Sequence, residues 1–272
     1  MTRRAGVVGS PITHSMSPVL HRAAYAALGL ADWTFDRDQV EAGGLSTHVG
    51  GLSDEWVGVS VTMPLKEEAL ALAVTRGDEA ELVGAANTLT RGEQGWRADN
   101  TDVQGLELAL REAGLGEVGS AVIVGSGATA RSALLALSRF GAHEVTFLVR
   151  DQVRPAAVAL AERLGMTVSS RNYAHGSGAW GSPGAVISTV PSGATPPVDG
   201  WRLPKGCVVF DVVYAGWPTP WAAQWRSEGV TVARGDRMLL HQAVAQVQLM
   251  TGRNAPVALM GEALSAALRA AP

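Results

Sequence analysis

The chain has 272 residues, of which 47% are apolar and 17% charged, and its 22 basic and 25 acidic residues leave a net charge of -3. This composition excludes intrinsic disorder and gives no support for a nucleic-acid partner or a polybasic membrane surface. No apolar run reaches the roughly 18 to 20 residues of a membrane span, and the start lacks the apolar segment of a signal peptide, so we expect a cytoplasmic protein. The one cysteine, Cys207, excludes an internal disulfide and a cysteine-based metal cluster. Its apolar neighbours predict a buried structural thiol, and we expect no bound metal.

The first hundred residues alternate short β-branched runs with amphipathic stretches, which is typical of βα units that feed a largely parallel sheet. Expected strands cover 5–9, 33–36, 56–62, 85–90 and 95–98, the last two as a hairpin, and expected helices cover 17–28, 64–74 and 103–113, with a short helix before residue 56. Pro64 should stand near the first position of its helix, with Glu67 and Glu68 in the first turn, where the helix dipole favours acids.

The second block opens with a continuous apolar run, 121–124, of the kind found in a strand buried on both faces. Further strands are expected at 144–149, 185–190, 207–214 and 229–232, helices at 130–140 and 155–164, and loops at 174–184 and 191–204. The chain ends in two expected helices, 238–250 and 256–270, with no strand between them. We therefore expect these helices to leave the second sheet and pack on the first block.

A glycine pattern, Gly125-x-Gly127-x-x-Ala130, lies between a predicted buried strand and a predicted helix, the context in which it indicates a dinucleotide site. The first glycine permits the tight turn, the second lets the backbone approach a pyrophosphate, and the small third residue lets helix and strand pack closely. The phosphate charge would then sit at the helix N-terminus. A glycine-rich turn that holds no ligand is the alternative.

The end of the next strand decides between the two nicotinamide cofactors. Arg150 and Arg154 could pair with the 2'-phosphate of NADP, whereas Asp151 could accept a hydrogen bond from the ribose hydroxyl of NAD. Two guanidinium groups favour NADP, with exposed charges at a helix start as the alternative for all three residues.

Polar residues in three loops of the first block point to a substrate. Ser17 before Pro18 is a good helix N-cap, yet Ser15 adds a second hydroxyl near the same N-terminus, which suits a carboxylate ligand. His14 and His21 receive no role, since lone histidines are more often structural.

Lys66 and Asp102 are the candidates for catalysis. Lys66 and Lys205 are the only lysines among the 22 basic residues, and Lys66 falls in a helix first turn, where a cation is slightly unfavourable. Asp102 precedes the helix that leads into the second block, so it would face the cleft where substrate meets cofactor. A surface lysine and an ordinary N-cap are the alternatives.

Several motifs together resemble the shikimate dehydrogenases over nearly the whole chain. In order, they are Ser15-x-Ser17-Pro18, Val61-Thr62-x-Pro64-x-Lys66, Gly84-Ala85-x-Asn87-Thr88, Asp99-Asn100-Thr101-Asp102, the turn at Gly125, Asp211-x-x-Tyr214, Trp217-x-Thr219-Pro220 and Gln242. The resemblance implies an α/β fold: an N-terminal α/β substrate domain (1–102), completed by the C-terminal helices (237–272), with a Rossmann-type NADP-binding domain (103–236) between.

The resemblance also implies a site and a reaction. NADPH would deliver hydride to the ring ketone of 3-dehydroshikimate, Lys66 would donate a proton to the developing alkoxide, and Asp102 would hold the geometry. Arginine cannot give up a proton, which would explain a lysine in an arginine-rich chain. Implied substrate-binding residues are Ser15, Ser17, Thr62, Lys66, Asn87, Asp102, Tyr214 and Gln242, and implied cofactor-binding residues are Gly125, Ser126, Gly127, Ala128, Thr129, Ala130, Arg150, Arg154 and Gly235.

Three departures from the family pattern leave alternatives open. Ser60 stands where many members have Asn, Val149 and Asp151 replace the usual neighbours of Arg150, and Arg237 occupies a position that is often Gly. An NAD-dependent quinate/shikimate dehydrogenase and a non-catalytic ligand sensor of the same fold are the alternative functions. We expect a monomer or a homodimer whose partners are small molecules.

Overall fold

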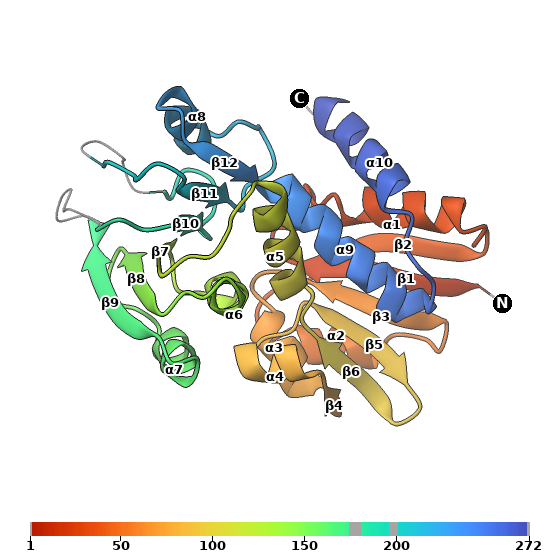
Figure 1. Cartoon of the computed structure of the whole chain (residues 1–272). Coiled ribbons are helices and arrows are strands. Elements are labelled where there is room, and N and C mark those ends of the chain that lie inside the picture. The colour runs from red at the N-terminus through yellow and green to blue at the C-terminus, as the bar shows by residue number, and fades with distance from the viewer. Residues whose placement is uncertain (1, 174–180, 196–200, 271–272) are drawn as a thin grey trace. The chain divides into compact units, whose positions relative to one another are not determined.

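The structure, a computed structural model, describes residues 2–173, 181–195 and 201–270. The chain divides into two compact units (Figure 1), one made of Met1–Asp102 and Leu239–Pro272 and the other of Val103–Met238. Each unit contains one six-stranded sheet with helices packed on it, which confirms the α/β class expected from the sequence. Within the described ranges, no helix combines the length and the apolar character needed to cross a bilayer.

The first unit contains a mixed sheet with the strand order β2-β1-β3-β5-β6-β4. Its strands are β1 (Arg3–Gly9), β2 (Trp33–Gln39), β3 (Trp56–Val61), β4 (Thr75–Arg76), β5 (Thr88–Gly92) and β6 (Gly95–Asp99). β1 pairs in parallel with β2 and β3, while β5 and β6 form the expected antiparallel hairpin. The carboxyl ends of β1 and β3 therefore meet at one edge of the sheet, and the loops that follow them leave from the same side.

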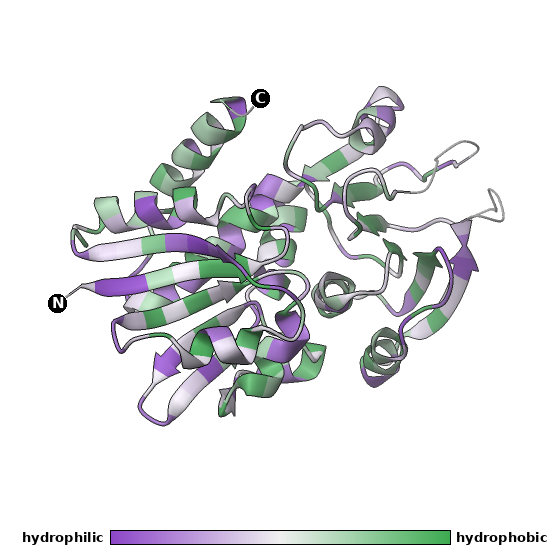
Figure 2. Cartoon of the chain, turned by 180° about the vertical axis from the view of Figure 1, so that it is seen from behind, coloured by the Kyte–Doolittle hydropathy of each residue, from purple (hydrophilic) through white to green (hydrophobic). Residues whose placement is uncertain are grey.

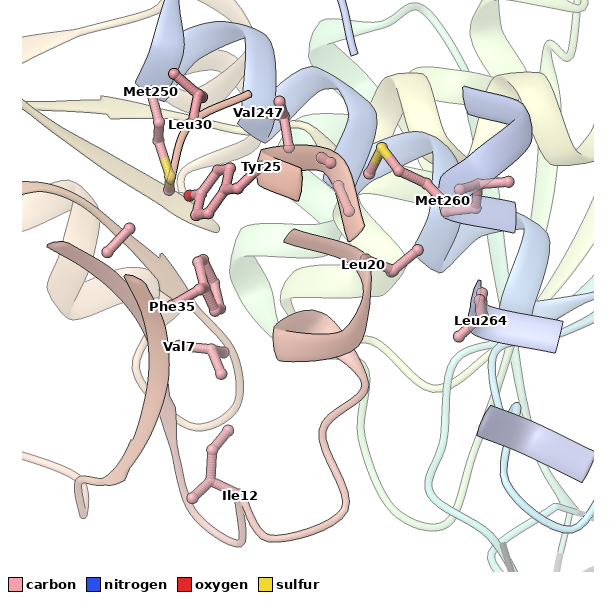
Figure 3. Close-up of a cluster of buried hydrophobic side chains, with 14 residues drawn as sticks. Val7, Ile12, Leu20, Tyr25, Leu30, Phe35, Val247, Met250, Met260 and Leu264 are labelled. Carbon is pink, nitrogen blue, oxygen red and sulfur yellow. The ribbon is translucent and has the colours of Figure 1, made fainter. Parts of the chain in front are cut away.

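Helices cover both faces of this sheet. They are α1 (Ser17–Ala27), α2 (Leu45–Gly50), α3 (Lys66–Leu72), α4 (Asp78–Val83), the part of α9 (Gly235–Thr251) that belongs to this unit, and α10 (Val257–Ala270). Because side chains alternate along a strand, Val7 of β1 joins a core with α1, α9 and α10, whereas Val8 joins a core with α2 and α3. Figure 3 shows the first of these cores, where Val247 and Met250 lie close to Tyr25. The expectation that the C-terminal helices pack on the first block is confirmed.

The second unit contains a fully parallel sheet with the order β12-β11-β10-β7-β8-β9. Its strands are β7 (Ser120–Val124), β8 (Glu144–Val149), β9 (Thr167–Asn172), β10 (Ala185–Ser188), β11 (Val208–Asp211) and β12 (Thr231–Arg234), and its helices are α5 (Asp102–Glu112), α6 (Ala128–Arg139), α7 (Pro155–Arg163) and α8 (Pro220–Ser227). Read from β9, this is the doubly wound Rossmann order, and the strand order reverses between β7 and β10, where such sheets bind dinucleotides.

Four elements were not predicted: β4, α4, β9 and α8. β9 is an edge strand whose residues are mostly exposed, so it lacks the apolar run that marks a buried strand. Figure 2 shows this difference, with hydrophilic residues along β9 and hydrophobic residues along the central strands. The short α8 begins at Pro220 after a Thr219 cap, a local signal without a strong apolar period.

Some predicted bounds were wrong. The expected helix 64–74 begins only at Lys66, so Pro64 precedes it, and the expected strand 207–214 ends at Asp211. Of the two expected loops, 174–180 and 196–200 lie outside the described residues.

Candidate functional site

Lys66 begins α3, one short turn after β3 ends. Its Nζ lies 2.6 Å from Asp102 Oδ2, and the two side chains are only 13% and 6% exposed. The carbonyl of Lys66 also accepts a hydrogen bond from the backbone N–H of Ala86 at 2.8 Å, which ties the start of α3 to the segment that carries Asn87. Lys66 is thus not a surface lysine, because its ammonium is paired in a shielded place.

Asp102 is the first residue of α5, and both of its oxygens are used. Oδ2 pairs with Lys66, and Oδ1 accepts a hydrogen bond from Asn87 Nδ2 at 2.9 Å. Its own N–H donates to Asn100 Oδ1 at 3.0 Å, so the preceding asparagine fixes the start of the helix. These contacts point the carboxylate at Lys66 and Asn87, which disfavours the interpretation of Asp102 as an ordinary N-cap.

Asn87 is buried and joins the group together. Besides Asp102, its Nδ2 lies 2.9 Å from Thr101 Oγ1 and 3.3 Å from Gln242 Oε1, and its Oδ1 accepts the N–H of Thr101 at 2.8 Å. The first unit therefore brings together four residues named from the sequence: Lys66, Asn87, Asp102 and Gln242. Thr101 and Asn100 stood inside recognised motifs without an assigned role, and only the structure shows what they do.

Ser15 and Thr62 lie in the loops that leave β1 and β3, and Ser17 begins α1 at the end of the first loop. These loops touch, because Ser10 N–H donates to the Met63 carbonyl at 2.9 Å. The alternative interpretation of Ser17 as the N-cap is wrong: α1 begins at Ser17 itself, and Met16 holds the cap position without a side-chain cap hydrogen bond. Ser15 Oγ accepts the N–H of Ser17 at 3.4 Å. No described hydrogen bond links either serine or Thr62 to Lys66, so their placement around one substrate stays a prediction.

His21 is a structural histidine, as expected. It is fully buried and stacks on Phe35 with ring centroids 3.9 Å apart. Burial lowers the pKa of His21 from 6.5 to about 3, against a smaller opposing effect of its hydrogen bond to Gln246. His14 is exposed.

The turn between β7 and α6 has the shape that a dinucleotide needs. Gly125 has a φ of +94°, which favours glycine, and a Cβ there would lie 2.8 Å from Thr189 Oγ1. At Gly127 no atom lies within 4 Å of a Cβ, so the backbone is open to an approaching pyrophosphate. Ala130 is fully buried against the sheet, and no side chain caps α6, whose first N–H groups include those of Ala128 and Thr129. The described residues therefore fit a nicotinamide dinucleotide.

Arg150 and Arg154 lie between the end of β8 and the start of α7 and are both exposed, as is Asp151. Ser126 Oγ accepts the backbone N–H of Arg154 at 3.1 Å, which joins the glycine turn to the β8 turn. Asn172 Nδ2 donates to the carbonyl of Arg150 at 2.6 Å and fixes its backbone. The backbone of Arg154 is therefore held beside the glycine turn and that of Arg150 beside the end of β9. The direction of their guanidinium groups toward a 2'-phosphate stays a prediction.

Gly235 and Tyr214 are the other two residues of the second unit that were predicted to contact cofactor or substrate. Gly235 opens α9, where a Cβ would lie 2.3 Å from the carbonyl oxygen of Val212, so close packing alone requires glycine. Tyr214 follows β11 and is half-buried. Their contacts with cofactor and substrate stay predictions.

Two side chains near β11 are structural. Burial raises the pKa of the Cys207 thiol to about 12, which confirms the predicted buried thiol. Asp211 accepts the Thr219 hydroxyl at 2.6 Å, and burial raises the pKa of its carboxyl. Among the described residues, no group of three or more His, Cys, Asp or Glu side chains is placed to hold a metal ion.

Comparison with known proteins decides the family. Residues 7–89 match the model described as shikimate dehydrogenase substrate binding domain, and residues 237–264 match that of the shikimate 5'-dehydrogenase C-terminal domain. A Methanothermobacter thermautotrophicus protein named shikimate dehydrogenase (NADP(+)) is 34% identical, with 98% of this chain and 97% of the relative covered. The chain belongs to the shikimate dehydrogenase family. A relative of the same name from Citrifermentans bemidjiense is 38% identical over 98% of this chain and 96% of its own.

Solved structures of shikimate dehydrogenases share the fold. That of Mycobacterium tuberculosis is 42% identical, with a TM-score of 0.82 over 97% of this chain and 99% of the other. That of Thermus thermophilus, solved in complex with NADP(H) and shikimate, is 27% identical with a TM-score of 0.83, over 98% of this chain and all of the other. The expected family and fold are confirmed.

Ser60 and Arg237, two of the residues in which this member of the shikimate dehydrogenase family departs from the family pattern, have hydrogen-bond partners. Ser60 Oγ donates to Gln246 Oε1 at 2.8 Å, so the hydroxyl is paired with a residue that the sequence did not single out. Arg237 forms two hydrogen bonds of 2.7 Å with Glu112, and this contact raises the pKa of the guanidinium. The pair joins α9 to α5 within the second unit, which gives Arg237 a structural role.

Proposed function

We propose that the protein is a shikimate dehydrogenase that reversibly reduces 3-dehydroshikimate to shikimate with NADPH, a step toward the aromatic amino acids. The observation that carries the proposal is the shielded Lys66–Asp102 pair, 2.6 Å long and held by Asn87, in a chain of this family. A reducing compartment such as the cytoplasm suits this activity and the free thiol of Cys207.

Different residues of the chain bind the substrate, bind the cofactor and transfer the proton. NADPH, when bound, supplies the hydride that reduces the ring ketone to a secondary alcohol. The ketone oxygen becomes an alkoxide, which needs one proton, and Lys66 can stabilise that charge and donate from Nζ. Asp102 fixes the ammonium, and after the transfer it passes a proton taken up from solvent on to the neutral amine. Ser15 and Ser17 supply hydroxyls for the substrate carboxylate, and the free N–H groups of α6 supply donors for the pyrophosphate.

An absorbance assay tests this function directly. We expect NADPH to form when shikimate is added to the protein with NADP+, and not when shikimate is omitted. Quinate in place of shikimate tests the wider substrate range. If shikimate binds by calorimetry but no NADPH forms, the alternative of a non-catalytic sensor is correct.

The cofactor preference follows from Arg150 and Arg154. A charge-assisted hydrogen bond contributes roughly 1.5 to 3 kcal/mol, and about 1.4 kcal/mol is tenfold, so we expect NADP to be preferred over NAD by about ten- to hundredfold. Arg150→Ala should remove most of that preference and leave kcat/KM for NAD nearly unchanged. Arg163→Ala, at an exposed arginine in the last turn of α7, is the matched control.

The alternative of an NAD-dependent enzyme predicts a preference for NAD over NADP. A related shikimate 5-dehydrogenase from Listeria monocytogenes, 25% identical, was solved with shikimate and NAD. If wild-type kcat/KM is higher for NAD than for NADP, Asp151 is the residue that contacts the ribose.

A further inference from the structure

Gln246 lies on α9, one helical turn after Gln242, and is 1% exposed. Its Nε2 donates to the carbonyl of Asn87 and to Thr88 Oγ1, both at 3.0 Å. Its Oε1 accepts the Ser60 hydroxyl at 2.8 Å and lies 3.3 Å from His21 Nε2. Both N–H bonds and both lone pairs of this carboxamide are therefore used.

The proton positions around Gln246 follow from its partners. A backbone carbonyl can only accept, so the nitrogen of the amide must face Asn87. The oxygen then faces His21, whose Nε2 must carry the proton, while Nδ1 accepts from the Tyr25 hydroxyl at 3.3 Å. Burial lowers the pKa of His21 to about 3, so the ring is neutral and brings no charge toward the site.

The same logic continues from Gln246 to the catalytic pair. Thr88 Oγ1 accepts from Gln246, so its single proton points to Asn87 Oδ1 at 2.8 Å. Asn87 Oδ1 also accepts the N–H of Thr101. With its oxygen held on that side, the amide of Asn87 must present Nδ2 to the carboxylate of Asp102. The reversed amide would place an oxygen against that carboxylate.

We infer that Gln246 is a positioning residue, which through Thr88 and the backbone of Asn87 orients the Asn87 amide that holds Asp102 against Lys66. The inference rests on the proposed function, and it names a residue that contacts neither Lys66 nor Asp102 among the described hydrogen bonds. Small displacements of a catalytic group are costly, about 10²-fold for 1 Å.

The test uses the full chain and two variants that cut this path. Gln246→Met keeps the volume and removes the amide, and Thr88→Val removes only the hydroxyl. Each should lower kcat with shikimate and NADP+ by about ten- to hundredfold and leave KM for NADP+ unchanged. Thr88→Ser, which restores the hydroxyl, should recover most of the loss.

Tyr25→Phe is the matched control, because it removes a buried hydrogen bond at the far end of the same chain of contacts. It should lower the melting temperature and leave kcat unchanged. If Gln246→Met and Thr88→Val lower only the melting temperature, as Tyr25→Phe does, Gln246 is merely structural and the inference is wrong.

A readout without substrate separates this inference from the proposed function. The side-chain amide signal of Asn87, identified by its loss in Asn87→Asp, should shift in the NMR spectrum of free Gln246→Met and stay in place in Tyr25→Phe. A wild type that does not oxidise shikimate would overturn the proposed function alone, whereas an unshifted Asn87 signal would overturn the role of Gln246.

Discussion

Lys66 can donate a proton, which arginine cannot do. A guanidinium can stabilise an alkoxide but cannot supply the proton. Removing a buried charge partner also leaves the other charge uncompensated, so variants of the Lys66–Asp102 pair must be compared at temperatures where each is folded.

Lys66→Ala should lower kcat by about 10²- to 10⁴-fold while shikimate still binds, because the proton donor acts on the transition state more than on the ground state. Asp102→Asn should behave similarly, and the double variant should be little worse than either single one if the two act as a unit. Steady-state kinetics and calorimetry measure both. Lys205→Ala, at the exposed second lysine, is the control. Near-normal turnover of Lys66→Ala would refute its role.

The sequence predicted the residues whose chemistry is unusual for their position, and missed those that act through geometry. Lys66 stood out as a rare lysine at a helix start, and Asp102 and Asn87 stood in recognised motifs. Gln246 had no such signal, because its four partners come from segments far apart in the chain. Only the packing of α9 against the first sheet creates that site.

At the scale of elements, α1 and α8 begin in different ways. α1 begins at Ser17 without a side-chain cap, whereas Thr219 Oγ1 accepts the N–H of Ala222 at 3.0 Å at the start of α8. The hydroxyl of Ser17 thus does not cap its helix, whereas that of Thr219 does.

Ser17→Ala should therefore raise KM for shikimate by about tenfold, the value of one hydrogen bond to a charged group, with kcat unchanged. The carboxylate contact is used equally in the ground and transition states. Its unfolding free energy should change by less than the roughly 1 kcal/mol of a lost cap. Thr219→Ala should show the reverse: lower stability and an unchanged KM. An unchanged KM in Ser17→Ala would mean that Ser17 does not bind substrate.

Buried strands and long amphipathic helices were predictable from the sequence, while short or edge elements with polar residues were not. β7 and β10 are continuous apolar runs, and the sequence located both. β9 and α4 carry mostly polar or exposed residues, so their structure depends on neighbouring strands and helices rather than on a local pattern. The start of α3 was placed too early because a proline was expected inside the first turn rather than before it.

At the scale of the whole molecule, the hydrophobic core of the first unit is formed by both the N-terminal segment and the helices α9 and α10. Its core combines residues of β1, α1 and β2 with Leu240, Val247, Met260 and Leu264 from the last two helices (Figure 3). His21 lies within this core, stacked on Phe35 and bonded to Gln246 of α9. The protonation of one buried ring is thereby linked to the stability of the fold.

Burial of His21 makes the stability of the fold depend on pH. The pKa of His21 is about 3 in the folded protein and about 6.5 when the chain is unfolded. Between these two pH values the unfolded state therefore binds up to one more proton than the folded state. The contribution of neutral His21 to the free energy of unfolding should therefore be fully present above pH 6.5. It should fall with decreasing pH by up to about 1.4 kcal/mol per pH unit. Urea unfolding between pH 5 and 6.5 measures this slope.

His21→Gln should lower that slope by up to about 1.4 kcal/mol per pH unit, whatever its effect on stability at neutral pH, because the titrating group is gone. His14→Gln, at an exposed histidine, should keep the wild-type slope. Comparing slopes rather than absolute stabilities separates the lost proton linkage from the lost contacts with Phe35 and Gln246. Equal slopes in wild type and His21→Gln would show that the ring takes up its proton without unfolding the core.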